Sequence, residues 1–272
     1  MLKQRVLTAI VLIAILTGVI YHGSKDLFTI FTGIMIFIAG WEWAGLSGST
    51  SIYSRLVYAS FITGILLFFA LGMQKSQLVG MSLLGTVWWC VALILVIFCQ
   101  SGKRLIPNRR IARYFLGLFV LLPASLSLIS QYKSASGPSY VLLLFTLIWT
   151  VDSTAYFIGK EWGSQRLANR ISPGKSWEGF ISSMLVAVIP PLVFINVRSI
   201  TGTDAIFLVC LCIVSAGFSV VGDLFESMIK RDANMKDSGR LLPGHGGVLD
   251  RIDSLTAAAP VFVLGLWMIE GK

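Results

Sequence analysis

One apolar stretch in the last third of the chain carries polar groups along a single helical face. Asp223 is followed after four, seven and eight residues by Ser227, Lys230 and Arg231, and residues at these spacings are neighbours on a helix. Asp223 follows Asp204 by about 19 residues, which is roughly 28 Å of helical rise in a membrane core of about 30 Å. We therefore expect these groups at a membrane boundary, where they could bind a metal ion and phosphates.

The next apolar stretch begins with two more carboxylates. Asp250 and Asp253 are three residues apart, with Arg251 between them. Acidic groups in a first helical turn can simply complement the helix dipole, and that structural role is one interpretation. The other is a Mg²⁺ site, because Mg²⁺ is commonly held by one or two carboxylates while phosphates and waters complete its octahedron. Asp223 and Asp250, from consecutive helices, are the candidate ligands.

The segment that joins these two stretches, residues 230–251, is basic and rich in glycine. Glycines allow backbone N–H groups to approach a polyphosphate closely, and nearby cations offset its charge. This pattern favours a nucleoside triphosphate site over an ordinary basic loop. The single histidine of the segment could act as an acid or base, bind phosphate or only form a turn. The candidate phosphate-binding residues are Lys236, Asp237, His245, Gly246, Gly247 and Arg251.

An upstream apolar run, residues 139–158, carries an acidic group at depth. Asp152 lies six residues before the inner end of this run, or roughly 9 Å along a helix. Ionisable groups inside a membrane are costly and usually mark functional sites or buried pairs. Tyr156 and Gly159 continue the same helical face toward the next loop. We expect Asp152 to belong to the site rather than to a purely structural pair.

The loop that follows, residues 159–178, contains Gly174-Lys175-Ser176 and invites comparison with a phosphate-binding P-loop. That pattern requires a glycine five residues before Gly174, where this chain has Asn169, and we expect no strand before the segment. The segment is therefore not a P-loop. We interpret it as a turn that presents Lys175 to a phosphate.

The elements that position these groups are predicted to be membrane spans. Of the 272 residues, 56% are apolar and 13% are charged, about half the charged share (~25%) of an ordinary soluble domain. This composition excludes a disordered protein, a basic nucleic-acid-binding domain and a typical cytosolic enzyme. The chain is predicted to be an all-α, polytopic integral membrane protein with one membrane domain over residues 1–272. Its nine expected transmembrane helices are 6–20, 27–46, 56–72, 78–99, 111–130, 139–158, 179–197, 204–229 and 252–270.

The distribution of Lys and Arg predicts the orientation in the membrane. With the N-terminus inside, seventeen of the 22 Lys and Arg residues fall on the inner side and five on the outer side. Cytoplasmic loops carry such an excess of basic residues. We therefore expect a cytoplasmic N-terminus, an outside C-terminus, and a site on the cytoplasmic face of a bacterial inner membrane.

The chain divides by function into two expected regions. Residues 139–272 are the catalytic spans, with cytoplasmic loops 159–178 and 230–251. The spans of residues 1–130 have almost no ionisable group at depth and are expected to form a scaffold or a dimer surface. Glu42 is an exception, but it stands between two tryptophans and fits an interfacial aromatic belt. We expect Glu42→Gln to stay largely active.

The stretch from Ser227 to Asp253 resembles a known signature. It reads Ser-Met-Ile-Lys-Arg, four residues, then Lys-Asp-Ser-Gly-Arg-Leu-Leu-Pro-Gly-His-Gly-Gly-Val-Leu-Asp-Arg-Ile-Asp. This is similar to the signature of the phosphatidate cytidylyltransferase family, also called CDP-diacylglycerol synthases. DSTAYFIGKEWG at 152–163 and SPGKSWEG at 172–179 resemble further motifs of the family in the same order. Before residue 150 the resemblance is mainly topological.

The resemblance implies an activity and assigns roles to residues. Members join CTP and phosphatidic acid to give CDP-diacylglycerol and pyrophosphate, with Mg²⁺ required and a second cation such as K⁺ implied. The lipid phosphate oxygen attacks the α-phosphorus of CTP. We expect a homodimer with no nucleic-acid partner. By resemblance, the metal ligands are Asp223 and Asp250, the phosphate-handling groups are Ser227, Lys230, Arg231, Lys236 and His245, and further members of the site are Asp152, Lys175 and Asp253.

Two other functions remain open at this point. A CTP-dependent polyprenol kinase would use a similar nucleotide site but would transfer the γ-phosphoryl group to an alcohol. An ion-coupled transporter also has many spans with intramembrane carboxylates, although here the charges cluster at one face and the two halves are not alike. A CDP-alcohol phosphotransferase is disfavoured because its acidic motif begins with Asp-Gly, a dipeptide absent from this chain.

Overall fold

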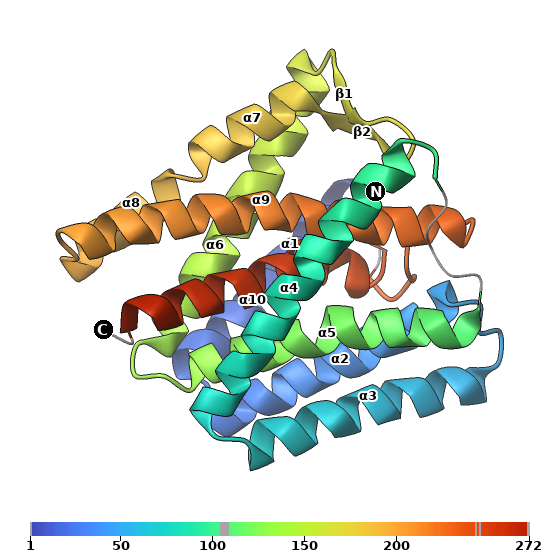
Figure 1. Ribbon diagram of the computed structural model, residues 1–272, viewed down its shortest axis with the longest axis horizontal. Helices are drawn as coiled ribbons and strands as arrows, with labels where there is room; N and C mark the ends of the chain where they lie inside the picture. Colours follow the sequence, from blue (N-terminus) through green and yellow to red (C-terminus); the bar gives the residue numbers. More distant parts are fainter. Residues whose placement is uncertain (1, 104–108, 243, 245, 271–272) are drawn as a thin grey trace.

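The computed structural model describes residues 2–270 except 104–108, 243 and 245, with no description of the side chains of residues 2–9, 75, 76 and 270. The described chain is almost entirely helical, with one small two-stranded sheet (Figure 1). The elements are α1 (Leu2–His22), α2 (Lys25–Leu46), α3 (Ile52–Gly72), α4 (Lys75–Gln100), α5 (Arg110–Tyr132), α6 (Gly137–Trp162), β1 (Arg166–Ala168), β2 (Ser172–Ser176), α7 (Trp177–Val186), α8 (Ile189–Arg198), α9 (Thr203–Asp232) and α10 (Leu249–Glu270).

The helices confirm the predicted membrane architecture. Within the described residues, eight helical segments are long and apolar enough to cross a membrane, and α1 adds the shorter apolar stretch Ile10–His22. Each of the nine predicted runs coincides with one of these segments. The protein is therefore an all-α, multi-pass membrane protein.

The predicted span 179–197 is broken in the middle. It consists of α7 and α8, which meet at Ala187 and Val188 just before Pro190 and Pro191. Two consecutive prolines lack the N–H groups that would continue the helical ladder, so the chain restarts as a new helix. Pro123 and Pro260, by contrast, lie inside α5 and α10 without ending them.

The expectation that no strand precedes the Gly-Lys-Ser segment is wrong. β1 and β2 pair antiparallel, with Arg166 opposite Ser176 and Ala168 opposite Ser172. Lys175 consequently lies on a strand and not in the predicted turn. The hairpin returns the chain to α7, whose N-terminus is capped by the Ser176 hydroxyl accepting from Gly179 N–H at 3.2 Å.

α10 is the central helix of the bundle. It packs against α9, α4 and α5 (Figure 1). In its most apolar segment 67% of the residues are buried, compared with 28% in the corresponding segments of α3 and α4. Gly222 of α9 permits close contact with α10, because a Cβ at this position would overlap the carbonyl oxygen of Asp253. Small residues at such contacts let helix backbones approach closely in membranes. The two helices with the most acidic groups are thus held tightly side by side.

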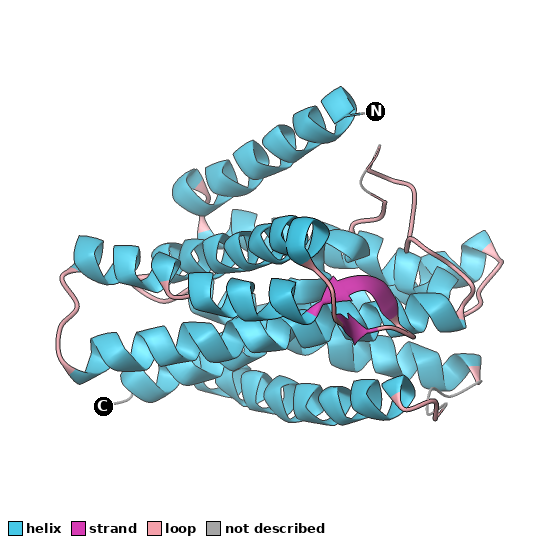
Figure 2. Ribbon diagram, turned by 90° about the horizontal axis from the view of Figure 1, so that it is seen from above, coloured by secondary structure: helices cyan, strands magenta, loops and turns pink. Residues whose placement is uncertain are grey.

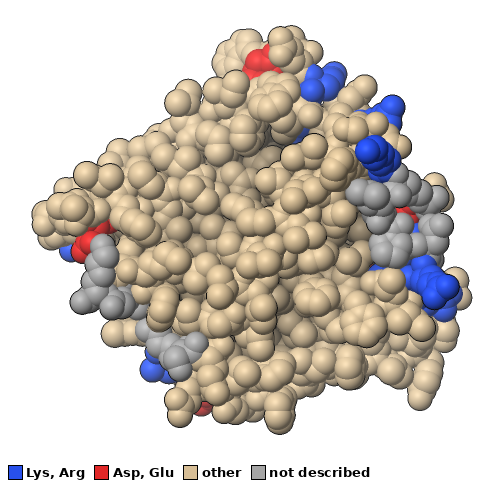
Figure 3. All heavy atoms as spheres, viewed as in Figure 1, with Lys and Arg blue, Asp and Glu red and all other residues tan. Residues whose placement is uncertain are grey.

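α1 stands apart from the remaining helices, as seen in Figure 2. Its C-terminal end is anchored by Tyr132 of α5, whose hydroxyl donates toward the carbonyl of Gly23 at 2.8 Å. The Tyr132 ring also stacks on Phe28, with ring centroids 3.9 Å apart. On the face shown in Figure 3, Lys and Arg gather mainly at the end where the β-hairpin lies in Figure 1, and the surface between the two ends is almost uncharged.

Candidate functional site

A cavity of about 680 Å³ opens at the end of the bundle that carries the hairpin. Its walls come from α6, β1, β2, α7, α9, the α9–α10 loop and α10, so it unites the two loops that the sequence singled out. The predicted site residues that line it are Asp152, Lys175, Asp223, Lys230, Asp237, Asp250, Arg251 and Asp253.

Other predicted residues do not line the cavity. Ser227 contacts Asp223 from the next helical turn, and Gly246 and Gly247 lie behind the wall that Asp250 forms. Arg231 and Lys236 are exposed to solvent. His245 lies outside the described residues, so its role stays a prediction.

Asp223 lies at the mouth of the cavity between a lysine and a serine. Lys175 Nζ is 2.6 Å from its Oδ2 atom, and the Ser227 hydroxyl donates to Oδ1 at 3.2 Å. The side chains of Lys175 and Asp223 are 25% and 29% exposed. This ion pair joins the hairpin to α9, and its exposure leaves both charges within reach of a ligand.

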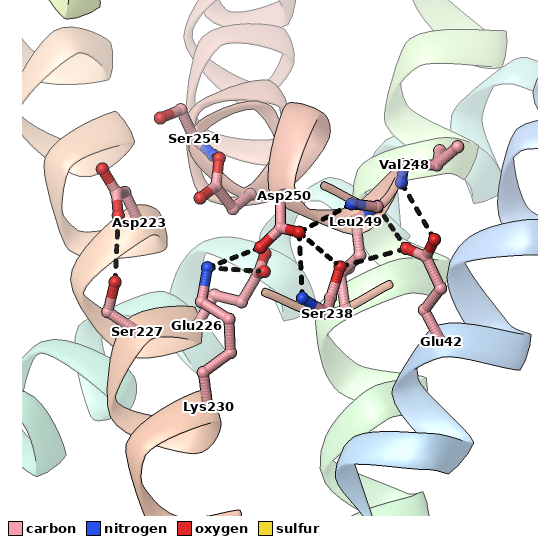
Figure 4. Close-up of polar contacts among 12 residues, drawn as sticks. Glu42, Asp223, Glu226, Ser227, Lys230, Ser238, Val248, Leu249, Asp250 and Ser254 are labelled. Atoms are coloured by element: carbon pink, nitrogen blue, oxygen red, sulfur yellow. Dashed lines mark hydrogen bonds and ion pairs between the residues drawn. The ribbon is translucent and has the colours of Figure 1, made fainter. Parts of the chain in front are cut away.

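Lys230 occupies a more buried position between two carboxylates (Figure 4). Its Nζ atom lies 2.7 Å from Asp250 Oδ1 and 3.2 Å from Glu226 Oε1. The three side chains are 4% to 11% exposed. Apart from this ion pair with Lys230, the Glu226 carboxylate has no hydrogen-bond partner among the described residues. Glu226 was not among the predicted site residues, although its position four residues before Lys230 was an available signal.

Asp250 organises the end of the α9–α10 loop. Its Oδ2 atom accepts hydrogen bonds from the Ser238 amide and hydroxyl, both at 2.9 Å, and from the Gly247 amide at 2.8 Å. The Gly247 N–H is therefore committed to Asp250 and is not free for a phosphate while this bond persists. Gly246 adopts a left-handed backbone with φ of 83°, a conformation that glycine accommodates easily.

The interfacial interpretation of Glu42 is wrong. Its side chain is buried, with 4% exposure, and points into the α9–α10 loop (Figure 4). It accepts hydrogen bonds from the amides of Val248 and Leu249 at 3.0 and 2.8 Å, and from the Ser238 hydroxyl at 3.1 Å. The partners lie about 200 residues away in the sequence, so the flanking tryptophans gave a misleading signal.

Asp152 extends the site onto α6. The Ser254 hydroxyl lies 3.5 Å from its Oδ1 atom, and Tyr156 and Gly159 line the same cavity, as the helical spacing predicted. Gly159 also faces Gly179 of α7, where a Cβ would overlap the carbonyl oxygen of Ala155. This contact between small residues fixes one wall of the cavity.

Comparisons with known proteins identify the family. A model described as "Cytidylyltransferase family" matches residues 3–269. The chain is 41% identical over 271 residues to a phosphatidate cytidylyltransferase of Pseudomonas aeruginosa, covering 98% of this chain and 97% of that protein. It is 35% identical to a protein of the same name from Haemophilus influenzae, with 96% and 97% covered. This chain belongs to the cytidylyltransferase family. It is therefore an enzyme of the nucleotidyltransferase class.

The charges around the cavity suit a cytidylyltransferase, whose substrates carry phosphates. The lining contains five carboxylates and five cations, so it is close to electrically neutral. Anions can be bound where the cations are partly exposed, as Lys175 is. Two of the cations, Lys160 and Arg166, were not among the predicted site residues. The available signals were the position of Lys160 within the 152–163 motif and that of Arg166 within the predicted loop 159–178.

The donor set of this family member also suits Mg²⁺. Each carboxylate oxygen offers about two lone pairs. Asp223 uses one on each oxygen, and Asp250 uses one on Oδ1, so both residues keep a position for a cation. The described residues contain no group of three or more His, Cys, Asp or Glu side chains arranged for a metal. Two carboxylates are enough for Mg²⁺ when phosphates complete its shell.

Proposed function

We propose that this enzyme transfers the cytidylyl group of CTP to phosphatidic acid, giving CDP-diacylglycerol and pyrophosphate. The observation that supports this most directly is the polar cavity at one end of the membrane helices, where Lys175 and Lys230 stand beside Asp223 and Asp250. The full-length similarity to proteins named phosphatidate cytidylyltransferase agrees with it. A water-soluble nucleotide and a lipid headgroup could meet in such a cavity.

The reaction replaces one phosphoanhydride bond by another. A phosphate oxygen of phosphatidic acid forms a bond to the α-phosphorus of CTP, while the bond from that phosphorus to the bridging oxygen breaks and pyrophosphate leaves. Nucleophile and leaving group are both anionic, so positioning and charge neutralisation matter more than proton transfer. Lys175 and Arg166 of the β-hairpin and Arg251 of α10 supply positive charge to the cavity.

We assign the Mg²⁺ of this reaction to Asp223 and Asp250. A bound Mg²⁺ supplies Lewis-acid stabilisation of charge on phosphate oxygens. In the protein, Ser227 orients Asp223, and Ser238 with Gly247 orients Asp250. A second cation such as K⁺ is part of the proposal. Asp152 and Asp253 are further carboxylates of the cavity lining that could balance added positive charge.

The proposal places the site at the cytoplasmic face of a bacterial inner membrane, where CTP is available. The excess of Lys and Arg on the inner side of the predicted topology supports this. Residues 1–130 would then provide the scaffold and a homodimer surface. Only 28% of the apolar segment of α3 and of α4 is buried.

The deciding experiment follows the phosphorus atoms of CTP. Detergent-purified protein is incubated with Mg²⁺, phosphatidic acid and CTP labelled at either the α- or the γ-phosphorus, and label in the lipid phase is counted. We expect label from the α position only, together with released pyrophosphate. Label from the γ position in an added polyprenol would instead identify a kinase, and label from neither would contradict nucleotide transfer.

A further inference from the structure

The hydrogen bonds between Glu42 and the α9–α10 loop have no role in the reaction described so far. We propose that Glu42 is a positioning residue, which holds Asp250 and the start of α10 in the geometry needed by the active site. This inference rests on the proposed function, since it concerns the carboxylate assigned to Mg²⁺. It reverses the expectation that Glu42→Gln stays largely active.

The residue that precedes α10, Val248, has no side-chain acceptor that could cap the helix. The first four N–H groups of a helix have no partner within it and are usually satisfied by Ser, Thr, Asp or Asn just before the helix. Here Val248 precedes Leu249, and valine cannot cap. The Glu42 carboxylate from α2 accepts both of their N–H groups. A residue far away in the sequence thus provides the missing cap and adds a favourable negative charge.

Glu42 and Asp250 share a hydrogen-bonding group. The Ser238 hydroxyl lies 3.1 Å from Glu42 Oε2 and 2.9 Å from Asp250 Oδ2 (Figure 4). The Ser238 amide also donates to Asp250. Ser238 therefore forms a bridge from α2 to the cavity wall, and a shift of Glu42 would be passed to Asp250 through one residue.

The loop is also shaped around the Glu42 carboxylate. A Cβ atom on either Gly239 or Gly247 would overlap its oxygens. Neither glycine has a positive φ, so backbone conformation does not require glycine at these positions. Glycine is needed at both positions because a side chain would occupy the space of the Glu42 carboxylate. These glycines of the loop thus serve close packing, in addition to any contact with phosphate.

A glutamine at position 42 cannot satisfy this arrangement. Oε1 accepts from Val248, and Oε2 accepts from Leu249 and Ser238. Either orientation of an amide places its NH₂ group against at least one backbone N–H, and a buried unsatisfied donor is costly. We expect the loop to move away and to carry Asp250 with it. Mutation of a residue that hydrogen-bonds to a metal ligand typically lowers metal affinity by about 10- to 100-fold.

The test compares Glu42→Gln with Asp26→Asn. Asp26 lies in the first turn of the same helix and is exposed, so it controls for loss of a carboxylate from α2. Mn²⁺ binding to each purified protein is measured by electron paramagnetic resonance without substrate. Separately, kcat and KM for CTP are measured with Mg²⁺. We expect Glu42→Gln to weaken Mn²⁺ binding at least about tenfold and to lower kcat/KM, while it elutes as a folded protein.

A second pair of variants keeps the test decisive if Glu42→Gln folds poorly. Gly239→Ala alone should lower kcat/KM, because its methyl group overlaps the carboxylate, but it should add little in a Glu42→Ala background. Unchanged Mn²⁺ affinity and kcat/KM in a folded Glu42→Gln, or additive effects of Gly239→Ala and Glu42→Ala, would overturn the positioning role. Failure of the wild-type protein to make CDP-diacylglycerol would contradict the proposed function instead. The comparison of Mn²⁺ affinities would still test whether Glu42 positions the metal site.

Discussion

At the scale of single residues, the two lysines of the site differ mainly in burial. Lys230 is 11% exposed and contacts two carboxylates that are also buried. Lys175 is 25% exposed and pairs with one carboxylate at the mouth of the cavity. Removing one partner from a buried ion pair leaves an uncompensated charge, whereas exposed pairs contribute little to stability. The two positions should therefore respond differently to the same substitution.

We predict that Lys230→Met lowers both stability and activity, whereas Lys175→Met lowers activity alone. Loss of Lys230 leaves Glu226 and Asp250 buried without their cation, which costs about 3–5 kcal/mol. Loss of Lys175 should reduce cytidylyl transfer by about 100-fold, as for removal of one group that stabilises developing charge. Thermal unfolding in detergent and initial rates with CTP measure the two effects. Equal loss of thermal stability in both variants would contradict this interpretation, and Lys25→Ala is a surface control.

A second prediction concerns the two candidate metal ligands. Asp223→Asn and Asp250→Asn should both abolish Mg²⁺-dependent transfer, but only the second should disturb the fold locally. Asp250 accepts three hydrogen bonds from the loop through a single oxygen, while Asp223 accepts one from Ser227 and pairs with Lys175. Hydrogen exchange of residues 238–250 reports the difference. Wild-type turnover in either variant would refute its assignment as a ligand.

At the scale of elements, the active site depends on contacts between helices through glycine. Gly159 and Gly179 bring α6 and α7 together beside the cavity, and Gly222 brings α9 against α10. Periodicity and apolar composition located these helices to within a few residues. They could not locate the contacts, because many glycines of a membrane protein face open space, as Gly217 does in α9.

We predict that Gly179→Leu separates α7 from α6 and lowers activity by at least about tenfold, because even its Cβ would overlap the carbonyl oxygen of Ala155 and overpacking forces backbone shifts. Gly217→Ala is the matched control: nothing lies within 4 Å of its Cβ position, and an alanine inside a helix gains about 0.5–1 kcal/mol over glycine. Initial rates and thermal unfolding temperatures are measured for both variants. An active, stable Gly179→Leu would show that this contact does not shape the cavity.

At the scale of the whole molecule, the sequence predicted the class of fold, the nine apolar runs and the region of the site. The spacing of charged residues within one helix was sufficient to group Asp223 with Lys230, since neighbours on a helix are fixed by its geometry. Such spacing could not identify the partners of Glu42, which follow it by about 200 residues. Only the packing of α2 against the α9–α10 loop reveals that contact. The β-hairpin was missed because its strands are short and polar.

The orientation of the whole molecule yields the last prediction. The β-hairpin and the α8–α9 connection lie at opposite ends of the bundle (Figure 1). Asn169 in the hairpin and Thr201 in the connection are both exposed. The positive-inside distribution predicts that Asn169 lies in the cytoplasm. Single cysteines are introduced at these positions after replacement of the native Cys90, Cys99, Cys210 and Cys212. In intact bacterial cells, a membrane-impermeant maleimide should label position 201 only, and position 169 should become labelled after permeabilisation. The reverse pattern would place the cavity outside the cell, away from CTP, and would contradict both the orientation and the proposed site.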